Sequence, residues 1–128
     1  MLVGHVNRPP WSTPDELSAL TRLEAERVRI LDQLAALRRG FQETVDASAD
    51  SNADDEHDPE GSTIAFERSQ LKALIHLAER HLDEIEEARM RVASRRYGLC
   101  ETCGQPISAA RLDARPEARI CIGCTSAQ

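Results

Sequence analysis

Aromatic residues are scarce in this chain, whose 128 residues include one Trp, one Tyr and two Phe. This shortage disfavours a thick globular core and, together with 30% charged residues, favours long exposed helices. Long apolar runs are missing too, so no segment approaches the ~18 consecutive apolar residues of a membrane span. Residues 1–11 lack the basic start and apolar stretch of a signal peptide, and we therefore expect a cytoplasmic protein.

A positive charge excess is also absent, because the formal net charge is −6. Such a chain repels a nucleic-acid backbone unless it carries a local basic face. Catalytic patterns are missing: the sequence has no Ser/His/Asp arrangement and no glycine loop that would hold a phosphate. The four histidines show no metal-ligand spacing among themselves. We therefore expect a protein that is not an enzyme.

The cysteines form the strongest pattern in the sequence. Cys100 and Cys103 make one Cys-x2-Cys pair, and Cys121 and Cys124 make a second pair after seventeen intervening residues. Two such pairs are typical of a site that binds one structural zinc ion through four thiolates. The segment 98–128 is shorter than the ~40 residues that usually fold without a metal or disulfides, so zinc should fold it. A thiol oxidoreductase and an iron–sulfur site are the alternatives for the same spacing.

A first helix is predicted from residue 14 to about residue 40. Thr13 can cap it, Pro14 suits the first helical position, and Glu16 completes a capping box. Arg38, Arg39 and Gly40 look like its end. The apolar residues of its seam are Leu20, Leu23, Ile30, Leu34 and Leu37, with Arg27 as the polar member.

A second helix is predicted over about 63–97, with Pro59 as an alternative start. Its seam consists of Ile64, Leu71, Ile75, Ala78, Leu82, Ile85 and Val92, with Arg68 and Arg89 as polar members. Both seams have a period near 3.5 residues, which predicts a coiled coil. The simplest arrangement is an antiparallel hairpin over 14–97 in a monomer. A compact helical bundle and a coiled coil between two chains are the alternatives.

An acidic segment, residues 42–63, connects the two predicted helices. It holds eight acidic residues and no Lys or Arg, and we predict a loop there. The expected organisation is an N-terminal tail over 1–13, the hairpin with its acidic tip, and a zinc module over 98–128. The fold class is thus predominantly α-helical: an antiparallel two-helix coiled-coil hairpin with a small C-terminal four-cysteine zinc finger.

The zinc segment resembles the DksA/TraR family of bacterial transcription regulators. The resemblance rests on the run Tyr97-Gly98-Leu99-Cys100-Glu101-Thr102-Cys103-Gly104, on Arg111-Leu112-Asp113-Ala114-Arg115-Pro116, and on Cys121-Ile122-Gly123-Cys124. It covers about residues 54–124. It implies a regulator that binds RNA polymerase and inserts its coiled coil into the secondary channel, with acidic tip residues near the active site. It also implies no direct sequence-specific DNA binding.

The resemblance also suggests which residues act at the tip. The acidic candidates are Asp54, Asp55, Glu56, Asp58 and Glu60. The family's tip pattern is Asp-x-x-Asp-x-Ala, whereas Gly61 and Thr63 stand at its second acid and its alanine in this chain. An arginine that contacts the alarmone ppGpp in some members matches Arg115, but Thr125 stands where those members have a lysine. The rival function is a zinc-ribbon adaptor whose coiled coil docks another protein.

Overall fold

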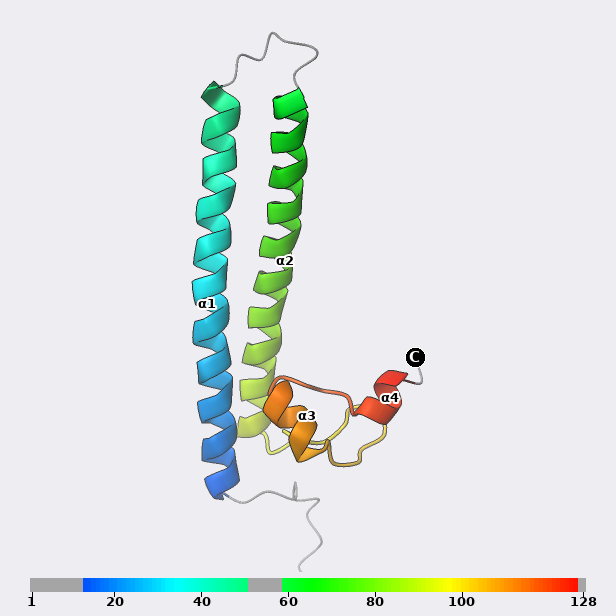
Figure 1. The fold of residues 1–128 in the computed structure, drawn as a ribbon. Helices are drawn as coiled ribbons and strands as arrows, with labels where there is room; N and C mark the ends of the chain where they lie inside the picture. Colours follow the sequence, from blue (N-terminus) through cyan, green and yellow to red (C-terminus); the bar gives the residue numbers. More distant parts are fainter. Residues whose placement is uncertain (1–12, 51–58, 127–128) are drawn as a thin grey trace, which may run out of the picture. The chain divides into compact units, whose positions relative to one another are not determined.

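The computed structural model describes residues 13–126 except for 51–58. It contains four helices: α1 (Thr13–Asp50), α2 (Pro59–Ala93), α3 (Ala109–Ala114) and α4 (Ile122–Ser126). α1 and α2 are antiparallel (Figure 1), and the predicted helical hairpin with a small C-terminal module is confirmed. Strands are absent from the described part, whose one isolated β-bridge joins Leu99 to Pro106. None of the described helices is long and apolar enough to cross a membrane.

The contacts divide the chain into two compact units. We call Met1–Val28 together with Asp83–Gln128 the zinc unit, and Arg29–Leu82 the hairpin unit. Each unit holds one part of α1 and one part of α2. The predicted start of the first helix agrees with the first residue of α1, whereas the predicted tail lies almost wholly outside the described residues.

The predicted end of the first helix near Gly40 is wrong, because α1 continues to Asp50. A glycine inside a helix costs only about 1 kcal/mol relative to alanine, and packing easily offsets that cost. The heptad pattern supplies this packing, since Phe41 is half-buried and Thr44 is 7% exposed. Gly40 itself faces the side chain of Leu71 on α2. The tertiary contact therefore overrides the local stop signal.

The acidic segment is more helical than predicted. α1 extends through 42–50, and α2 begins at Pro59, which was the alternative start. Proline suits the first turn of a helix because its missing N–H would have no partner there. Gln42 Nε2 donates to Asp46 Oδ1 at 3.0 Å, one turn further along α1. The predicted loop over 42–63 is therefore too long; Asp54, Asp55, Glu56 and Asp58 lie outside the described residues.

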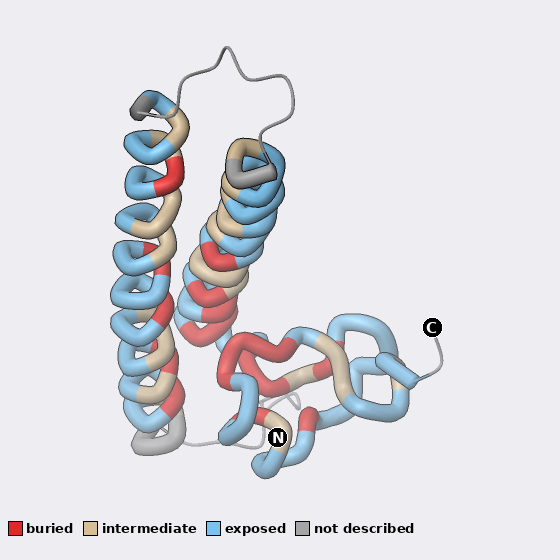
Figure 2. Tube along the Cα trace, turned by 45° about the horizontal axis from the view of Figure 1, so that its top comes forward, coloured by how far each residue is buried: buried red, intermediate tan, exposed pale blue. Residues whose placement is uncertain are grey.

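Buried residues line the facing sides of α1 and α2 (Figure 2). Most predicted seam residues are buried or half-buried, but the seam is shifted by one residue at two places. Ala19 is 1% exposed and Leu20 is 37% exposed, while Ala88 is fully buried and Arg89 is exposed. Both shifts place alanine in the seam of the zinc unit, where a small side chain lets the two backbones approach closely. In the hairpin unit, Arg38 Nη2 pairs with Glu79 Oε2 at 3.2 Å across the seam.

α2 ends in a tight turn four residues before its predicted end. The N–H of Arg96 donates to the carbonyl of Arg91 at 2.8 Å, and the N–H of Arg95 donates to the carbonyl of Val92 at 3.1 Å. This pair of bonds is a Schellman motif, in which one residue takes a left-handed conformation. Arg95 is that residue, with a φ of 61°. The turn stops the helix at Ala93 and directs the chain toward the cysteines.

Candidate metal centre

The four cysteines meet at one point within the zinc unit. The Sγ atoms of Cys100, Cys103, Cys121 and Cys124 all lie within 4.8 Å of one another. Cys103 Sγ and Cys121 Sγ, from different pairs, are 3.8 Å apart. A tetrahedral ion with metal–sulfur bonds of ~2.3 Å requires sulfur atoms ~3.8 Å apart. The described geometry thus fits one Zn²⁺ held by all four predicted ligands.

Each Cys-x2-Cys pair forms the same small turn. The N–H of Cys103 donates to Cys100 Sγ at 3.5 Å, and the N–H of Cys124 donates to Cys121 Sγ at 3.4 Å. In both pairs the second cysteine therefore donates its backbone N–H to the sulfur of the first. Gly104 follows the first turn with a φ of 74°, a conformation that suits glycine. These N–H groups stabilise negative charge on sulfur, as a zinc thiolate requires.

The thiols are also electrostatically coupled. Hydrogen bonds from backbone N–H groups, chiefly that of Cys121 and then that of Cys103, lower the pKa of Cys100 to about 6. Hydrogen bonds with the side chains of Cys121 and Cys103 raise the pKa of Cys124 to about 12. Cys100 thus ionises readily, whereas ionisation of Cys124 in the same cluster is opposed. A bound dication removes this opposition, so the donor set matches a metal better than four free thiols.

The sulfur shell is closed on one side and reachable on the other. Cys100 is 2% exposed, whereas Cys103 is exposed and the second pair is intermediate. Four thiolates leave no coordination position for water or substrate, which is the arrangement of structural zinc sites. The predicted cofactor, one structural zinc ion, is therefore confirmed by the cluster of four sulfurs.

The first cysteine turn sits in a short hydrogen-bonded hairpin. The N–H of Cys100 donates to the carbonyl of Gln105 at 2.8 Å, and the N–H of Ile107 donates to the carbonyl of Gly98 at 2.7 Å. Gly98, at the start of this hairpin, has a φ of 83°, a conformation that suits glycine. The hairpin therefore fixes the first pair at a short distance from the end of α2.

The second turn is held by Arg111, whose role sequence reasoning missed. Arg111 lies in α3, and its N–H donates to the capping oxygen of Ser108 at 3.2 Å. Its Nε donates to the carbonyl of Ile120 at 2.8 Å, next to Cys121. Its Nη2 also lies 3.4 Å from Thr125 Oγ1. The guanidinium therefore ties α3 to the second pair, and only its place within the family run could have drawn attention to it.

Buried polar contacts fasten the chain between the two pairs to α2 and its turn. The hydroxyl of Tyr97 donates to the carbonyl of Pro116 at 2.7 Å. Arg91 is buried, and its Nη2 donates to the carbonyl of Glu117 at 3.2 Å. On α1, Arg22 Nη1 lies 3.7 Å from Asp113 Oδ1 of α3. The zinc module is thus attached to both long helices of its unit.

Arg115 is not part of the sulfur cluster. The side chain of Arg115 is 58% exposed, and its Nε lies 3.7 Å from Glu117 Oε2. Glu60 belongs to the first turn of α2, next to the undescribed residues 51–58. The structure therefore brings together the four cysteines of the predicted set and leaves Arg115 on the surface of the zinc unit.

Comparison with known proteins gives a consistent result. Residues 95–127 match a family model described as the prokaryotic dksA/traR C4-type zinc finger. The chain is 31% identical to the RNA polymerase-binding transcription factor DksA of Escherichia coli K12 over 105 residues, which are 79% of this chain and 70% of that protein. It is 27% identical to general stress protein 16O of Bacillus subtilis over 110 residues, covering 81% of this chain and 68% of that protein.

A solved structure shares the fold. Transcription factor DksA2 from Pseudomonas aeruginosa matches with a TM-score of 0.75 and 24% identity, over 93% of this chain and 86% of that one. The match extends well beyond the zinc finger and includes both long helices. With the four clustered cysteines and the similarity to DksA over most of both chains, the conclusion follows that the chain belongs to the DksA/TraR family.

Proposed function

We propose that this protein is an RNA polymerase-binding regulator of transcription and not an enzyme. The proposal rests on the similarity to DksA over 70% of that protein's length. DksA is described as an RNA polymerase-binding transcription factor. The described chemistry agrees with this role, because the one cluster of potential metal ligands found in the described residues is a closed four-sulfur site. The protein would act in the cytoplasm, as a monomer, and without reading a DNA sequence.

The proposed mechanism places the hairpin in the secondary channel of the polymerase, with the acidic segment close to the active site. Negative charge near the end of a narrow hairpin would be attracted to a metal-bearing or positively lined channel. Glu43 and Asp46 are exposed on α1 and extend the acidic character of the segment into the helix. Asp54, Asp55, Glu56, Asp58 and Glu60 would supply the charge that acts on the initiation complex.

The zinc module would fix the end of α2 and present the docking surface of the zinc unit. Zinc supplies four strong bonds and no reactivity of its own in such a site. Arg115 remains our candidate for contact with ppGpp or with the polymerase, since its guanidinium is more than half exposed. A guanidinium is well suited to phosphate or carboxylate because of its planar, forked donors.

A transcription assay with purified polymerase and a ribosomal-type promoter tests the proposal. We expect the protein to change transcript yield and to bind polymerase in a pull-down, but not to shift free promoter DNA. Changing the five tip acids to their amides should abolish the effect on yield while binding persists. The matched control changes five acids that are exposed on the helices, Glu24, Asp32, Glu67, Asp83 and Glu86. An adaptor function would be favoured instead if polymerase binding is absent, or if both sets of changes leave activity intact.

A further inference from the structure

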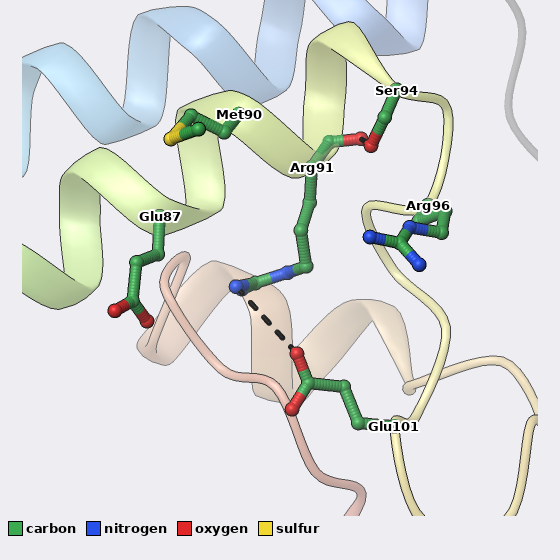
Figure 3. A pocket seen from close by; sticks show the side chains of 6 residues that line it. All are labelled: Glu87, Met90, Arg91, Ser94, Arg96 and Glu101. Carbon is green, nitrogen blue, oxygen red and sulfur yellow. Dashed lines mark hydrogen bonds and ion pairs between the residues drawn. The ribbon is translucent and has the colours of Figure 1, made fainter.

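A pocket of about 360 Å³ lies where α2 ends, within the zinc unit. Its walls come from the last turns of α2, the turn that follows, and the first cysteine turn (Figure 3). None of the metal-binding cysteines lines it. The lining residues are Glu87, Met90, Arg91, Ser94, Arg96 and Glu101.

Two guanidinium groups border this pocket in different ways. Arg91 is buried and points toward Glu101, with Nη1 4.0 Å from Oε1, the upper limit of an ion pair. Burial lowers the pKa of Arg91, because desolvation disfavours its charge more than Glu101 favours it. Arg96 comes from the turn after α2, is exposed, and has no ion pair within the described part of the chain. Arg96 is therefore the lining guanidinium that still has capacity for an anion.

The charge around the pocket differs in sign from that of the whole chain. Arg119 pairs with Glu87 at 3.8 Å and with Glu101 at 3.9 Å, so both acids are already shared with cations. With Arg91 and Arg96, this neighbourhood carries three arginines and two glutamates, an excess of one positive charge. The complete chain carries a net charge of −6. The pocket is therefore a local attractor for negative groups.

A carboxylate fits this pocket better than a phosphate. Glu87 and Glu101 are offset by Arg91 and Arg119, so one positive charge remains for a ligand. A singly charged carboxylate balances that charge, whereas a doubly charged phosphate leaves excess negative charge beside the two glutamates. Met90 is 64% exposed and offers an apolar surface beside the charged groups. Arginine and methionine are enriched in protein–protein interfaces, in which a polar rim surrounds apolar contacts. The pocket thus has the composition of a site for an acidic side chain next to an apolar one on a protein surface.

We infer that this pocket receives an acidic side chain of a protein partner, with Arg96 as the main new ion-pair donor and Met90 as its apolar neighbour. The inference rests on the proposed function, which makes RNA polymerase the partner. It adds a contact in the zinc unit that the acidic tip does not provide. Arg91 is a positioning residue here, because its guanidinium is already bonded to the carbonyl of Glu117.

Two neighbouring arginines provide a matched pair of variants. Arg96 lines the pocket, whereas its neighbour Arg95 is also exposed and does not line the pocket. Arg96→Gln and Arg95→Asn remove the same charge, and asparagine tolerates the positive φ of position 95. We expect Arg96→Gln to weaken binding to core RNA polymerase by about tenfold or more and Arg95→Asn by about twofold or less. Met90→Ala should weaken binding to an intermediate extent, and circular dichroism should verify that each variant is folded.

A photo-crosslinking amino acid at Ser94 identifies what enters the pocket. We expect it to crosslink to polymerase peptides that contain Asp or Glu beside an apolar residue. Equal effects of the Arg96 and Arg95 variants on polymerase binding would overturn the inference. They would show that only the net positive charge of the region attracts the polymerase. Calorimetric binding of inorganic phosphate that is lost in Arg96→Gln would also overturn it, in favour of a phosphate site. If the wild-type protein does not bind polymerase, the proposed function itself fails; if it binds and Arg96→Gln binds equally well, the pocket inference alone fails.

Discussion

The hydroxyl of Tyr97 donates a 2.7 Å hydrogen bond to the carbonyl oxygen of Pro116. Tyr97 is 2% exposed and lies in the turn after α2, whereas Pro116 belongs to the chain between the two cysteine pairs. One buried bond therefore links the end of the long helix to the loop that zinc closes.

Replacing Tyr97 by Phe should destabilise the folded protein. The change leaves the carbonyl of Pro116 buried without this donor, at a cost of about 1–2 kcal/mol in the free energy of unfolding. Urea denaturation of the zinc-loaded protein measures the loss. Thr21→Ala is the control, because it removes an exposed hydroxyl that donates to the carbonyl of Leu17 at 2.9 Å. A Tyr97→Phe protein as stable as the wild type would contradict the importance of this bond.

Stability should fall in alkaline solution through the same residue. Burial raises the pKa of the Tyr97 hydroxyl above its usual value of 10.0. The folded protein therefore holds this proton more tightly than the unfolded chain, in which tyrosine ionises near pH ~10. The stabilisation is complete below that pH and is lost as the pH rises from the unfolded pKa through the folded one. Denaturation at several alkaline pH values should show a smaller decline for Tyr97→Phe; identical slopes would refute this assignment.

Removing zinc should unfold the C-terminal module while most of the helix signal persists. α3 and α4 contain 6 and 5 residues, against 38 and 35 in α1 and α2. A strong chelator should release one zinc ion per chain and collapse the amide NMR signals of residues 98–126. Cys103→Ser should reproduce the collapse, whereas Thr102→Ala, in the same turn but without a ligand role, should not. An apo-protein with an unchanged NMR spectrum would contradict structural zinc.

Arg95→Gly should stabilise the protein. Arg95 takes a φ of 61° in the turn that ends α2, which costs an L-residue about 1 kcal/mol that glycine does not incur. We expect the thermal midpoint to rise by several degrees, roughly what about 1 kcal/mol gives in a domain of this size. Arg96→Gly is the control: Arg96 is not among the described residues with positive φ, so glycine there should give no gain. A lower midpoint for Arg95→Gly would show that the arginine side chain stabilises the turn.

Gly40→Ala should also stabilise the protein, by up to about 1 kcal/mol in helix propensity. A methyl group built at Gly40 would lie 3.7 Å from Leu71 Cδ1, an ordinary packing distance, so the seam can accept it. Urea denaturation measures the effect, and the reverse change at an exposed site of α1, Ala35→Gly, should cost a similar amount. A destabilised Gly40→Ala variant would indicate that α1 needs the glycine for close approach or bending.

The zinc ligands could be predicted completely, because thiolate chemistry depends on residue type and spacing that the sequence displays directly. Helix ends could not, because Gly40 is a stop signal only when nothing packs beyond it. Phe41 and Thr44 continue the seam with α2. The residues around Gly40 do not reveal this contact, because α2 lies far along the sequence.

The one-residue shifts in the seam have a related cause. The spacing of the leucines predicts Leu20 in the seam, whereas the smaller Ala19 is the residue buried there. The contacts of Arg91 and Arg111 are hidden for another reason, since their partners lie 26 and 9 residues away along a folded chain. Such contacts follow from the closure of the zinc module and not from any periodic pattern.

The two cysteine turns repeat one local design, with the second backbone N–H of each pair on the first sulfur. Each pair therefore makes its own N–H···S hydrogen bond and offers two sulfur ligands on one short turn. Once either pair holds an ion, the remaining cost is the chain entropy lost when the seventeen-residue loop between Cys103 and Cys121 closes. Metal uptake can accordingly begin at either cysteine pair. The other pair then reaches the bound ion through the short loop that connects them.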